Sequence, residues 1–470
     1  MEQQEAMDEQ RDILFSTLVS PDIVRPCTMD DGIIGIGEEE QSYFITTFRE
    51  STIPFSFFIP ASGVGSRMFE FIYRFKQSAN DAEREDYFQF ISRLSSFAFY
   101  PLMAERWKSL TLNSEDELLA FCDYLLHPEG LNFRDIPKAL FPFHLDGLTP
   151  RTPMESHILQ AFKLSRKPSE IHFTIQQNHV KPIERQLEEW SERFPMALTS
   201  SVQPKHSDAF LFDEFKQPVL DGHGTPLRKP SGHGALIENL TPIETAVVFV
   251  KNIDNIQCNR MDDEVNRYWE MLGGLLLHLI STINEARETQ DLNTILSLNQ
   301  RFGFIPEIDG LADWETLSVV LNRPFRVCGM VRNEGMPGGG PFWVKHHDAV
   351  SKQIIEKAQI SQGHLSSLSA STHFNPVMMA LYKKDFDGQS FDLSSYVRKD
   401  LSMAVMKRNQ GKLVYHIEKP GLWNGSMYDW NSVFVEVPSH IFSPVKSVLD
   451  LMDPIHQCYS TQTGGRMKEN

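Results

Sequence analysis

The segment that most constrains the fold is a short apolar run followed by a glycine-containing turn and an amphipathic helix. Residues 56–59 read Ser-Phe-Phe-Ile without polar alternation, which is typical of a central strand buried on both faces. Residues 60–66 contain two glycines, and the apolar side chains that follow recur at helical spacing. These side chains are Met68, Phe71, Ile72 and Phe75. The segment therefore predicts a strand, a tight turn and a helix in direct succession.

The same alternation continues along the chain. Residues 171–175 and 246–250 are further apolar runs of strand length, and residues 183–194 between them favour a helix. Residues 264–300 place apolar side chains at steps of three and four, a pattern typical of a long helix packed on a core. Strands that alternate with helices predict an α/β fold with a mainly parallel, mixed sheet and helices on both faces.

The chain is long enough for two packed units or for one large elaborated unit. The changes of pattern along the sequence indicate four regions. They are an N-terminal helical extension at 1–50, an α/β core at 51–260, a helical insertion at 261–320 and a C-terminal elaboration of short strands and turns at 321–470.

Charge and composition exclude several classes of protein. With 45 Lys and Arg against 62 Asp and Glu, the formal net charge is −17, which would repel a nucleic acid over most of the surface but leaves room for a local basic pocket. No apolar run approaches the roughly 20 residues that span a bilayer, and the acidic, polar start is unlike a secretory signal. The five cysteines are scattered without a CxxC pair. We therefore expect reduced thiols in a cytoplasmic protein, without structural zinc and without a membrane or nucleic-acid partner.

The glycine-containing turn is the first candidate binding site. Glycines at the end of a buried strand let the backbone approach a phosphate, and the N-terminus of the next helix favours negative charge. Arg67 follows the turn, where its guanidinium would neutralise phosphates or a pyrophosphate leaving group. The candidate contacts in the turn are Ser62, Gly63, Gly65 and Ser66. A plain strand-to-helix connection is an equally good interpretation, because neither a Walker loop nor a complete GxGxxG pattern is present.

Two further segments offer a cation and a contact for a flat ring. Lys138 lies between proline and apolar residues at 137–142 and would direct its ammonium at a phosphate, although a solvated loop lysine is the commoner interpretation. Gly232 and Gly234 flank His233, so the backbone can approach a planar ring such as a nucleobase. The alternative is a turn in which His233 caps the next helix. No second ligand at helical or hairpin spacing supports a zinc site at His233.

Asp254 and Lys446 complete the set of candidates. Asp254 follows the apolar run at 246–250, and a carboxylate at the carboxyl end of a parallel strand lies where open α/β sheets bind ligands. It would hold a magnesium ion that bridges phosphates, or it would only cap the next helix. Lys446 lies in the segment 442–451, where it would supply a second cation to a phosphate or be an ordinary surface lysine.

Taken in order, these segments resemble the pattern of sugar nucleotidyltransferases, and in particular of eukaryote-type uridine-diphosphate-sugar pyrophosphorylases. The turn with Arg67 resembles the loop that holds the nucleoside triphosphate. Residues 137–140 resemble a Pro-Lys-x-Leu that normally follows that loop closely, so an insertion has to be assumed here. Residues 232–234 resemble a segment that contacts uracil, and residues 252–255 resemble a strand end whose aspartate serves the metal and phosphates. Residues 442–451 resemble a segment whose lysine reaches the phosphates, and the whole pattern implies a GT-A-like Rossmannoid fold.

Over nearly all of its length after about residue 30, the sequence more closely resembles a bacterial group, the domain-of-unknown-function 4301 family. The segments that carry this resemblance are 60–69, 137–144, 172–174, 232–240, 251–255, 323–342, 372–377, 421–427, 434–445 and 456–457. The sequence departs from that family's pattern at Met336, where a glutamate is usual, and at Met378, where an aspartate is usual. Gly338, Gly339 and Gly340 would lie against a sugar or a phosphate, or form only a flexible turn.

The resemblance to pyrophosphorylases implies an enzyme that joins a sugar 1-phosphate to a nucleoside triphosphate, with UTP favoured, and releases pyrophosphate with the help of Mg²⁺. The core at 51–260 would then bind the nucleotide, and the region 321–470 would complete the sheet on the sugar and phosphate side. We expect Arg67 and Lys138 at the triphosphate, Lys446 at the sugar phosphate and Asp254 at the metal. The expected nucleotide contacts are Gln203, Gly232, His233, Gly234 and Asn252.

Two other functions stay open. A nucleotide- or nucleotide-sugar-binding protein with weakened catalysis would account for methionine at Met336 and Met378. Another phosphoryl transfer, such as a kinase reaction, would use the same glycine turn. The base, the sugar and the oligomeric state are not predicted.

Overall fold

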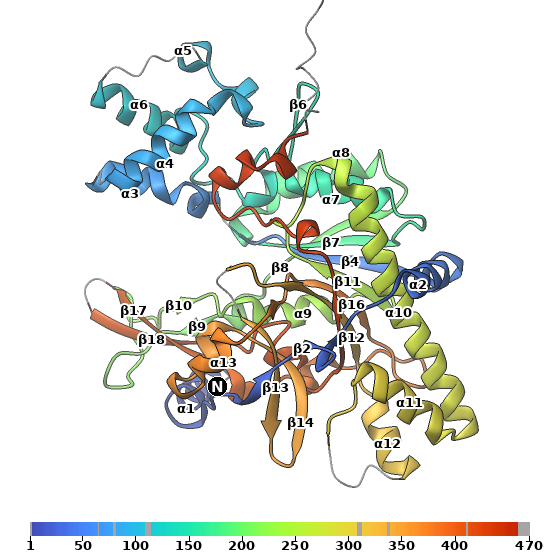
Figure 1. Cartoon of the computed structure of the whole chain (residues 1–470). Helices are drawn as coiled ribbons and strands as arrows, with labels where there is room; N and C mark the ends of the chain where they lie inside the picture. The colour runs from blue at the N-terminus through green and yellow to red at the C-terminus, as the bar shows by residue number, and fades with distance from the viewer. Residues whose placement is uncertain are drawn as a thin grey trace, which may run out of the picture.

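A ten-stranded mixed sheet forms the centre of the structure (Figure 1). The structure is a computed structural model that describes residues 2–63, 65–78, 81–108, 114–307, 313–335, 339–409 and 412–458. The strands of the ten-stranded sheet follow one another in the order β2-β3-β19-β12-β16-β11-β4-β7-β8, and β15 pairs with β12. In that order their bounds are Thr28–Met29, Gly32–Ile34, Asn431–Glu436, Phe325–Arg332, Met378–Tyr382, Val247–Lys251, Phe55–Pro60, Glu170–Ile175 and Ala197–Val202, with β15 at His373–Phe374.

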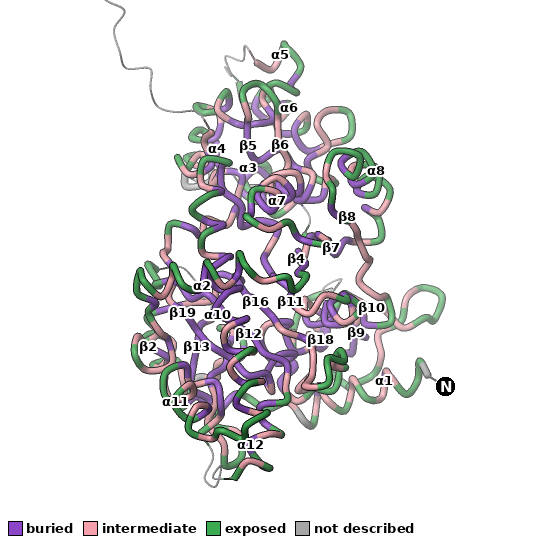
Figure 2. Tube along the Cα trace, turned by 90° about the vertical axis from the view of Figure 1, so that its right-hand side faces the viewer, coloured by how far each residue is buried: buried purple, intermediate pink, exposed green. Residues whose placement is uncertain are grey.

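Two parallel blocks make up this sheet, and one antiparallel strand joins them. β11, β4, β7 and β8 run parallel to their neighbours in one block, as do β12, β19, β3 and β2 in the other. β16 runs antiparallel to both of its neighbours, β11 and β12. β4, β7 and β11 are the three apolar runs predicted from the sequence, and they are buried because both faces of the sheet are covered (Figure 2). The prediction of an α/β fold with a mainly parallel, mixed sheet is confirmed.

Long helices cover one face of the sheet. They are α2 (Glu38–Glu50), α7 (Pro153–Phe162), α8 (Val180–Ser191) and α10 (Asp262–Thr289), and α11 (Leu292–Phe302) and α12 (Trp314–Leu321) follow α10. α10 is the long helix predicted at 264–300, and its apolar side is buried in the core, including Val265, Trp269 and Ile283. α2 lies so close to α10 that a Cβ on Gly274 would come 1.7 Å from the carbonyl oxygen of Phe44, so glycine permits this contact. Among the described residues, none of the helices is both long and apolar enough to cross a membrane.

Short helical turns and loops cover the other face. The 3₁₀ turn His233–Leu236 continues into α9 (Ile237–Leu240), and its apolar side chains pack on β4 and β11 together with those of the segment 422–430. Helices therefore lie on both faces, as predicted, although those on this face are short. A separate three-stranded sheet comprises β1 (Asp22–Pro26), β13 (Gly340–His346) and β14 (Ala349–Ile355), and α13 (Leu365–Ser369) follows it in the chain.

The segment 1–50 is joined to the rest of the fold. β3 extends the main sheet beside β19, β1 pairs with β13, and α2 packs on α10. α1 (Glu2–Asp12) lies instead beside two small sheets formed by β9 (Ala209–Phe210) with β10 (Arg228–Lys229) and by β17 (Met403–Asn409) with β18 (Lys412–Glu418). There Met7 and Leu14 pack against Phe210 and Phe212.

A helical lobe separates the glycine turn from Lys138 along the chain. It consists of α3 (Glu70–Ser78), α4 (Asp81–Ser92), α5 (Glu105–Lys108) and α6 (Glu115–Leu126), and it stands apart from the sheet in Figures 1 and 2. Its apolar side chains form a core of their own, which Val445, Val448 and Leu451 join from the C-terminal segment. The lobe occupies most of the sequence between Arg67 and Lys138, where the resemblance assumes an insertion. A hairpin of β5 (His144–Asp146) and β6 (Thr149–Arg151) follows it.

A disulfide joins Cys258, which follows β11, to Cys458 in the C-terminal segment. The two Cα atoms are 5.4 Å apart because the C-terminal segment returns to this place, where the amide of Cys258 donates to the carbonyl of Ile455. The expectation of reduced thiols is therefore wrong for this pair, whose sequence separation of 200 residues gives no local signal. Cys27, Cys122 and Cys328 are free and buried. The cytoplasmic expectation, which used the same cysteines, stays a prediction.

Candidate functional site

A cavity of about 990 Å³ lies at the carboxyl ends of β4, β7, β8 and β11. Open α/β sheets bind their ligands at this edge. The predicted residues that line the cavity are Ser62, Gly63, Arg67, Lys138, Gln203, Gly232, His233, Asn252, Asp254 and Lys446. Gly65, Ser66 and Gly234 lie outside its lining. The structure therefore brings most of the candidates to one place, although they come from segments far apart in the sequence.

The glycine turn forms one wall of the cavity. Ser62 and Gly63 border the cavity after β4 ends, and Arg67 is exposed at the start of the helical segment Gly65–Phe69. Gly65 itself is buried against the segment that precedes Lys138, since its N–H donates to the carbonyl of Ile136 at 3.1 Å. A Cβ on Gly65 would come 2.8 Å from that oxygen, so this glycine lets the two segments meet.

Lys138, Asp254 and Lys446 meet at the end of β11. The Oδ2 atom of Asp254 accepts from Lys138 Nζ at 3.3 Å and from Lys446 Nζ at 2.8 Å. The side chains of Lys138 and Asp254 are 10% and 11% exposed, whereas that of Lys446 is 65% exposed. Burial lowers the pKa of Lys138, although Asp254 opposes this shift. The two ammoniums carry one positive charge more than the carboxylate neutralises, so the group is suited to receive an anion.

Asp254 also has an oxygen that fits a metal. Its Oδ1 atom is buried and has no hydrogen-bond partner among the described residues, although a buried carboxylate oxygen is normally paired. The described ranges contain no group of three His, Cys, Asp or Glu side chains that would hold a metal by themselves. Mg²⁺ commonly binds through one or two carboxylates together with substrate phosphates and water. The residues present therefore fit a magnesium ion that a phosphate ligand helps to hold.

The C-terminal segment is fastened at the point where it presents Lys446. The amide of Val445 donates to the backbone carbonyl of Asp254 at 3.0 Å, and the carbonyl of Val445 accepts from Lys138 Nζ at 2.8 Å. Asp450 Oδ2 accepts the backbone N–H groups of Lys446 and Ser447 at 2.7 and 2.8 Å. The position of the Lys446 side chain therefore depends on contacts that its own segment makes.

His233 is engaged entirely within the protein. Its Nδ1 atom accepts the N–H of Leu422 at 3.0 Å, and its Nε2 atom lies 2.9 Å from Glu356 Oε1. Its ring stacks on the indole of Trp423, with centroids 4.0 Å apart and an interplanar angle of 21°. Both imidazole nitrogens are therefore engaged, and the ring of His233 supports Trp423, which also lines the cavity.

The two glycines beside His233 have different roles. Gly232 lines the cavity with a φ of +80°, a conformation that favours glycine. Gly234 is buried, and a Cβ there would come 2.1 Å from the carbonyl oxygen of Pro420. Gly234 thus permits the close approach of the segment that carries Trp423.

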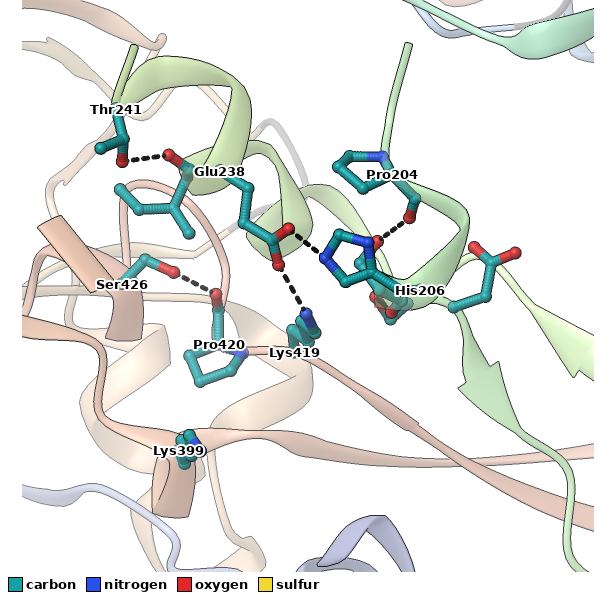
Figure 3. A network of polar contacts seen from close by, with 12 residues as sticks. Pro204, His206, Glu238, Thr241, Lys399, Lys419, Pro420 and Ser426 are labelled. Carbon is teal, nitrogen blue, oxygen red and sulfur yellow. Dashed lines mark hydrogen bonds and ion pairs between the residues drawn. The ribbon is translucent and has the colours of Figure 1, made fainter. Parts of the chain in front are cut away.

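A polar network holds this wall together (Figure 3). Glu238 of α9 lies 2.7 Å from Nε2 of His206, which belongs to the turn after β8, and accepts from Lys419 Nζ at 3.1 Å. The hydroxyl of Ser426 donates to the carbonyl of Pro420 and closes the loop that follows Lys419. The network therefore ties three segments that carry Gln203, Gly232 and Trp423 in the cavity lining.

Sequence reasoning missed several residues of this lining. They are Glu70, Gln176, Gln177, Asn178, Val202, Lys205, Asp208, Pro230, Leu236, Ile253 and Trp423, with Pro60 at the end of β4. Those at 176–178 follow β7, the parallel neighbour of β4, so their position at a strand end was a usable signal. Trp423 precedes β19 in a loop, and no strand-end position indicates it.

The two methionines at which we expected a departure from the family pattern lie differently. Met378 is the buried first residue of β16 and pairs with Lys251 of β11, but it does not line the cavity. Met336 and Gly338 lie outside the described residues. Gly339 packs on the end of β14, because a Cβ there would come 1.9 Å from the carbonyl oxygen of Ile355. Neither Gly339 nor Gly340, which begins β13, lines the cavity.

Comparison with solved structures finds distant likenesses. The chain is similar to the uridine diphosphate N-acetylglucosamine pyrophosphorylase of Trypanosoma brucei, at 13% identity and a TM-score of 0.48, over 95% of this chain and 74% of that one. It is similar to a UDP-glucose phosphorylase of the same organism, at 12% identity and a TM-score of 0.44, over 92% and 69% of the two chains. The inositol-1-phosphate CTP transferase of T. maritima gives 7% identity and a TM-score of 0.36 over 86% and 94%.

These likenesses are too distant to assign an activity, and no curated protein matches the sequence. The family comparison is different in extent. The model of the domain of unknown function DUF4301 matches residues 1–457 of the sequence, which is nearly the whole chain. The chain therefore belongs to the DUF4301 family.

Proposed function

We propose that this protein is a nucleotidyltransferase that joins a sugar 1-phosphate to a nucleoside triphosphate and releases pyrophosphate. The observation that carries the proposal is the contact of Lys138, Asp254 and Lys446 at the end of β11. This group shares one cavity with the glycine turn and Arg67. Three cations and one partly unpaired carboxylate are what a triphosphate and its magnesium ion require.

The reaction follows from charge and position. An oxygen of the sugar phosphate attacks the α-phosphorus in line, a new P–O bond forms, and the bond to the β-phosphate breaks to release pyrophosphate. The attacking oxygen is already an anion, so the site needs no strong base. Catalysis then comes from holding the two phosphates together and neutralising the charge that builds up on them.

Each cation has a place in this scheme. Arg67 and Lys138 would bind the triphosphate, and Lys446, which is more exposed, would bind the incoming sugar phosphate. Both ammoniums contact one oxygen of Asp254, and a phosphate would compete with that oxygen for them. Asp254 would then hold Mg²⁺, which neutralises phosphate charge when it is bound. Gln203, Gly232 and Asn252 would contact the nucleotide, and the resemblance to uridine-diphosphate-sugar pyrophosphorylases favours UTP.

Pyrophosphate release tests the proposal directly. The purified protein is incubated with each nucleoside triphosphate and a set of sugar 1-phosphates, with Mg²⁺ or with a chelator. We expect release with one preferred pair only when Mg²⁺ is present. Lys446→Met should lower kcat by about 10²–10³, the usual cost of one contact made to transition-state charge. The matched control is Lys399→Met, since Lys399 is exposed and pairs with Glu9 outside the cavity.

A nucleotide-binding protein without catalysis is the second candidate. Met378 motivates it, because the resemblance leads us to expect an aspartate at this position, although Met378 is buried and does not line the cavity. Saturable nucleotide binding without pyrophosphate release from any pair would replace the first proposal with this one. Transfer of phosphate to an acceptor without pyrophosphate would instead identify a kinase.

A further inference from the structure

Four apolar residues line the cavity among its charged and polar ones. They are Val202, Pro230, Leu236 and Trp423, and Gln203, Lys205 and Asp208 belong to the same lining. Their segments are held together, since Asn239 Nδ2 donates to the carbonyl of Val202 at 3.1 Å and the amide of Lys419 donates to the carbonyl of Ser231 at 2.8 Å. Leu236 ends the same 3₁₀ turn that begins with His233, the ring on which Trp423 stacks. The cavity thus offers an aromatic ring and apolar side chains in addition to its charges.

Trp423 is fixed in place before any ligand arrives. Its carbonyl accepts from Arg326 Nη1 at 2.6 Å, and Arg326 is 0% exposed and also donates from Nε to Ser432 Oγ. The neighbouring amide, that of Leu422, donates to His233. Because both the loop and the ring are held, the indole would lose little freedom when a ligand binds, which favours affinity.

We propose that Trp423 is the surface on which the nucleobase of the substrate stacks, a deepening that rests on the proposed function. A base offers a planar apolar face to the indole and a polar edge to the Gln203 amide. A sugar ring has no comparable planar aromatic face to offer the indole. The ring of His233 stacks on the indole, and both of its nitrogens are engaged within the protein, so His233 does not read the base.

Calorimetric titration of two ligands tests this assignment. UTP carries a base, whereas inorganic tripolyphosphate presents only the phosphates, and both are measured with Mg²⁺ on the full chain. Trp423→Ala should weaken UTP binding about tenfold to a hundredfold, the usual loss for one base–aromatic stack. Tripolyphosphate affinity should not change. Trp423→Phe keeps an aromatic face and should retain most of the UTP affinity.

Trp fluorescence supplies a readout that a structural role would not move. UTP should quench the emission of the wild-type protein, and Trp423→Phe should lose this quenching while it still binds UTP. Trp430→Phe is the matched control, because Trp430 is buried in the same apolar cluster but does not line the cavity. That variant should keep the quenching.

Several outcomes would overturn the assignment. Unchanged UTP affinity in Trp423→Ala would do so, and so would an equal loss for UTP and tripolyphosphate, which would mean that the loop had collapsed. A loss of sugar 1-phosphate affinity with UTP affinity intact would assign the indole to the sugar. Pyrophosphate release separates the two proposals: binding of UTP that depends on Trp423, without any pyrophosphate release, would remove the proposed reaction and leave the stacking surface.

Discussion

Asp450 holds Lys446 by its backbone, since Asp450 Oδ2 accepts the N–H of Lys446 at 2.7 Å. Removing this carboxylate in Asp450→Ala should move the ammonium of Lys446 away from Asp254. The kcat of pyrophosphate release should then fall by about tenfold or more, because small misplacements of catalytic groups are costly. The loss of a capping side chain should also cost about 1 kcal/mol in the free energy of unfolding. Asp450→Asn keeps an acceptor oxygen and should be milder. Wild-type kcat in Asp450→Ala would show that the turn holds Lys446 without this contact.

Lys138 should matter for the binding of phosphates. In Lys138→Met, Asp254 keeps its contact with Lys446, so the carboxylate stays paired while one cation is lost. Charge-assisted contacts contribute about 1.5–3 kcal/mol, so affinity for tripolyphosphate should fall about tenfold to a hundredfold. Titration calorimetry measures this, with Lys163→Met as the control, because Lys163 pairs with Asp262 away from the cavity. An equal loss of tripolyphosphate affinity in both variants would mean that only the net charge of the protein matters, and not the contact made by Lys138.

Gly274 should be sensitive to a single methyl group. A Cβ at this position would lie 1.7 Å from the carbonyl oxygen of Phe44, which is backbone and cannot swing away. Gly274→Ala should therefore push α2 from α10 and cost about 1–3 kcal/mol in the free energy of unfolding, as overpacking does. Gly222→Ala is the control, since a Cβ on Gly222 would meet no described atom within 4 Å and Gly222 has no positive φ. Denaturant unfolding followed by circular dichroism should separate the two variants.

Two stacked histidines should make stability depend on pH. His144 Nε2 and His456 Nδ1 lie 3.3 Å apart. Burial, together with the nearby positive charges, lowers the pKa of His144 to about 3. Burial also lowers the pKa of His456 to about 4. In the unfolded chain both would titrate near about 6.5. Below that pH the unfolded chain binds protons that the folded protein does not, so stability is complete above about pH 6.5 and is lost as the pH falls towards about 4.

The size of this effect can be measured. Each histidine should reduce the free energy of unfolding by up to about 1.4 kcal/mol per pH unit in that window. Denaturant unfolding at a series of pH values gives the slope, and His456→Asn should make it shallower. A slope between about pH 6.5 and 5 that His456→Asn leaves unchanged would assign the dependence to other groups.

The central strands were predictable because a strand buried on both faces of a sheet has a continuous run of apolar residues in its sequence. β4, β7 and β11 are continuous apolar runs, and α10 shows its core side through apolar spacing. β3 has only the three residues Gly32–Ile34, too few for any periodicity, so its place in the main sheet could not be seen. The pairing of Cys258 with Cys458 depends on where the chain returns in space, which no local pattern encodes.

The candidate site was predictable in part for the same reason. Asp254 follows a recognisable buried strand, but its contacts with Lys138 and Lys446 span 116 and 192 residues, and only the order of motifs indicated them. The engagement of His233 by Glu356 and Leu422 could not be read from the Gly-His-Gly pattern. Trp423 lies in a loop whose position depends on a buried arginine in β12, so its place in the cavity follows from packing.

The segment that presents Lys446 has a consequence for how the protein is made. During synthesis the glycine turn and Asp254 leave the ribosome long before Lys446 does. The carbonyl of Val445, which accepts from Lys138 Nζ, emerges equally late. The last strand of the main sheet, β19, ends at Glu436, so a chain that stops just after it contains the whole sheet and still lacks a finished site. Termination between residues 437 and 445 would leave every strand of the main sheet in the chain but remove Lys446 from the cluster of charges, whereas earlier termination would also remove β19 and then β16 and β12. The cell would thus acquire the assembled site in one late step of translation.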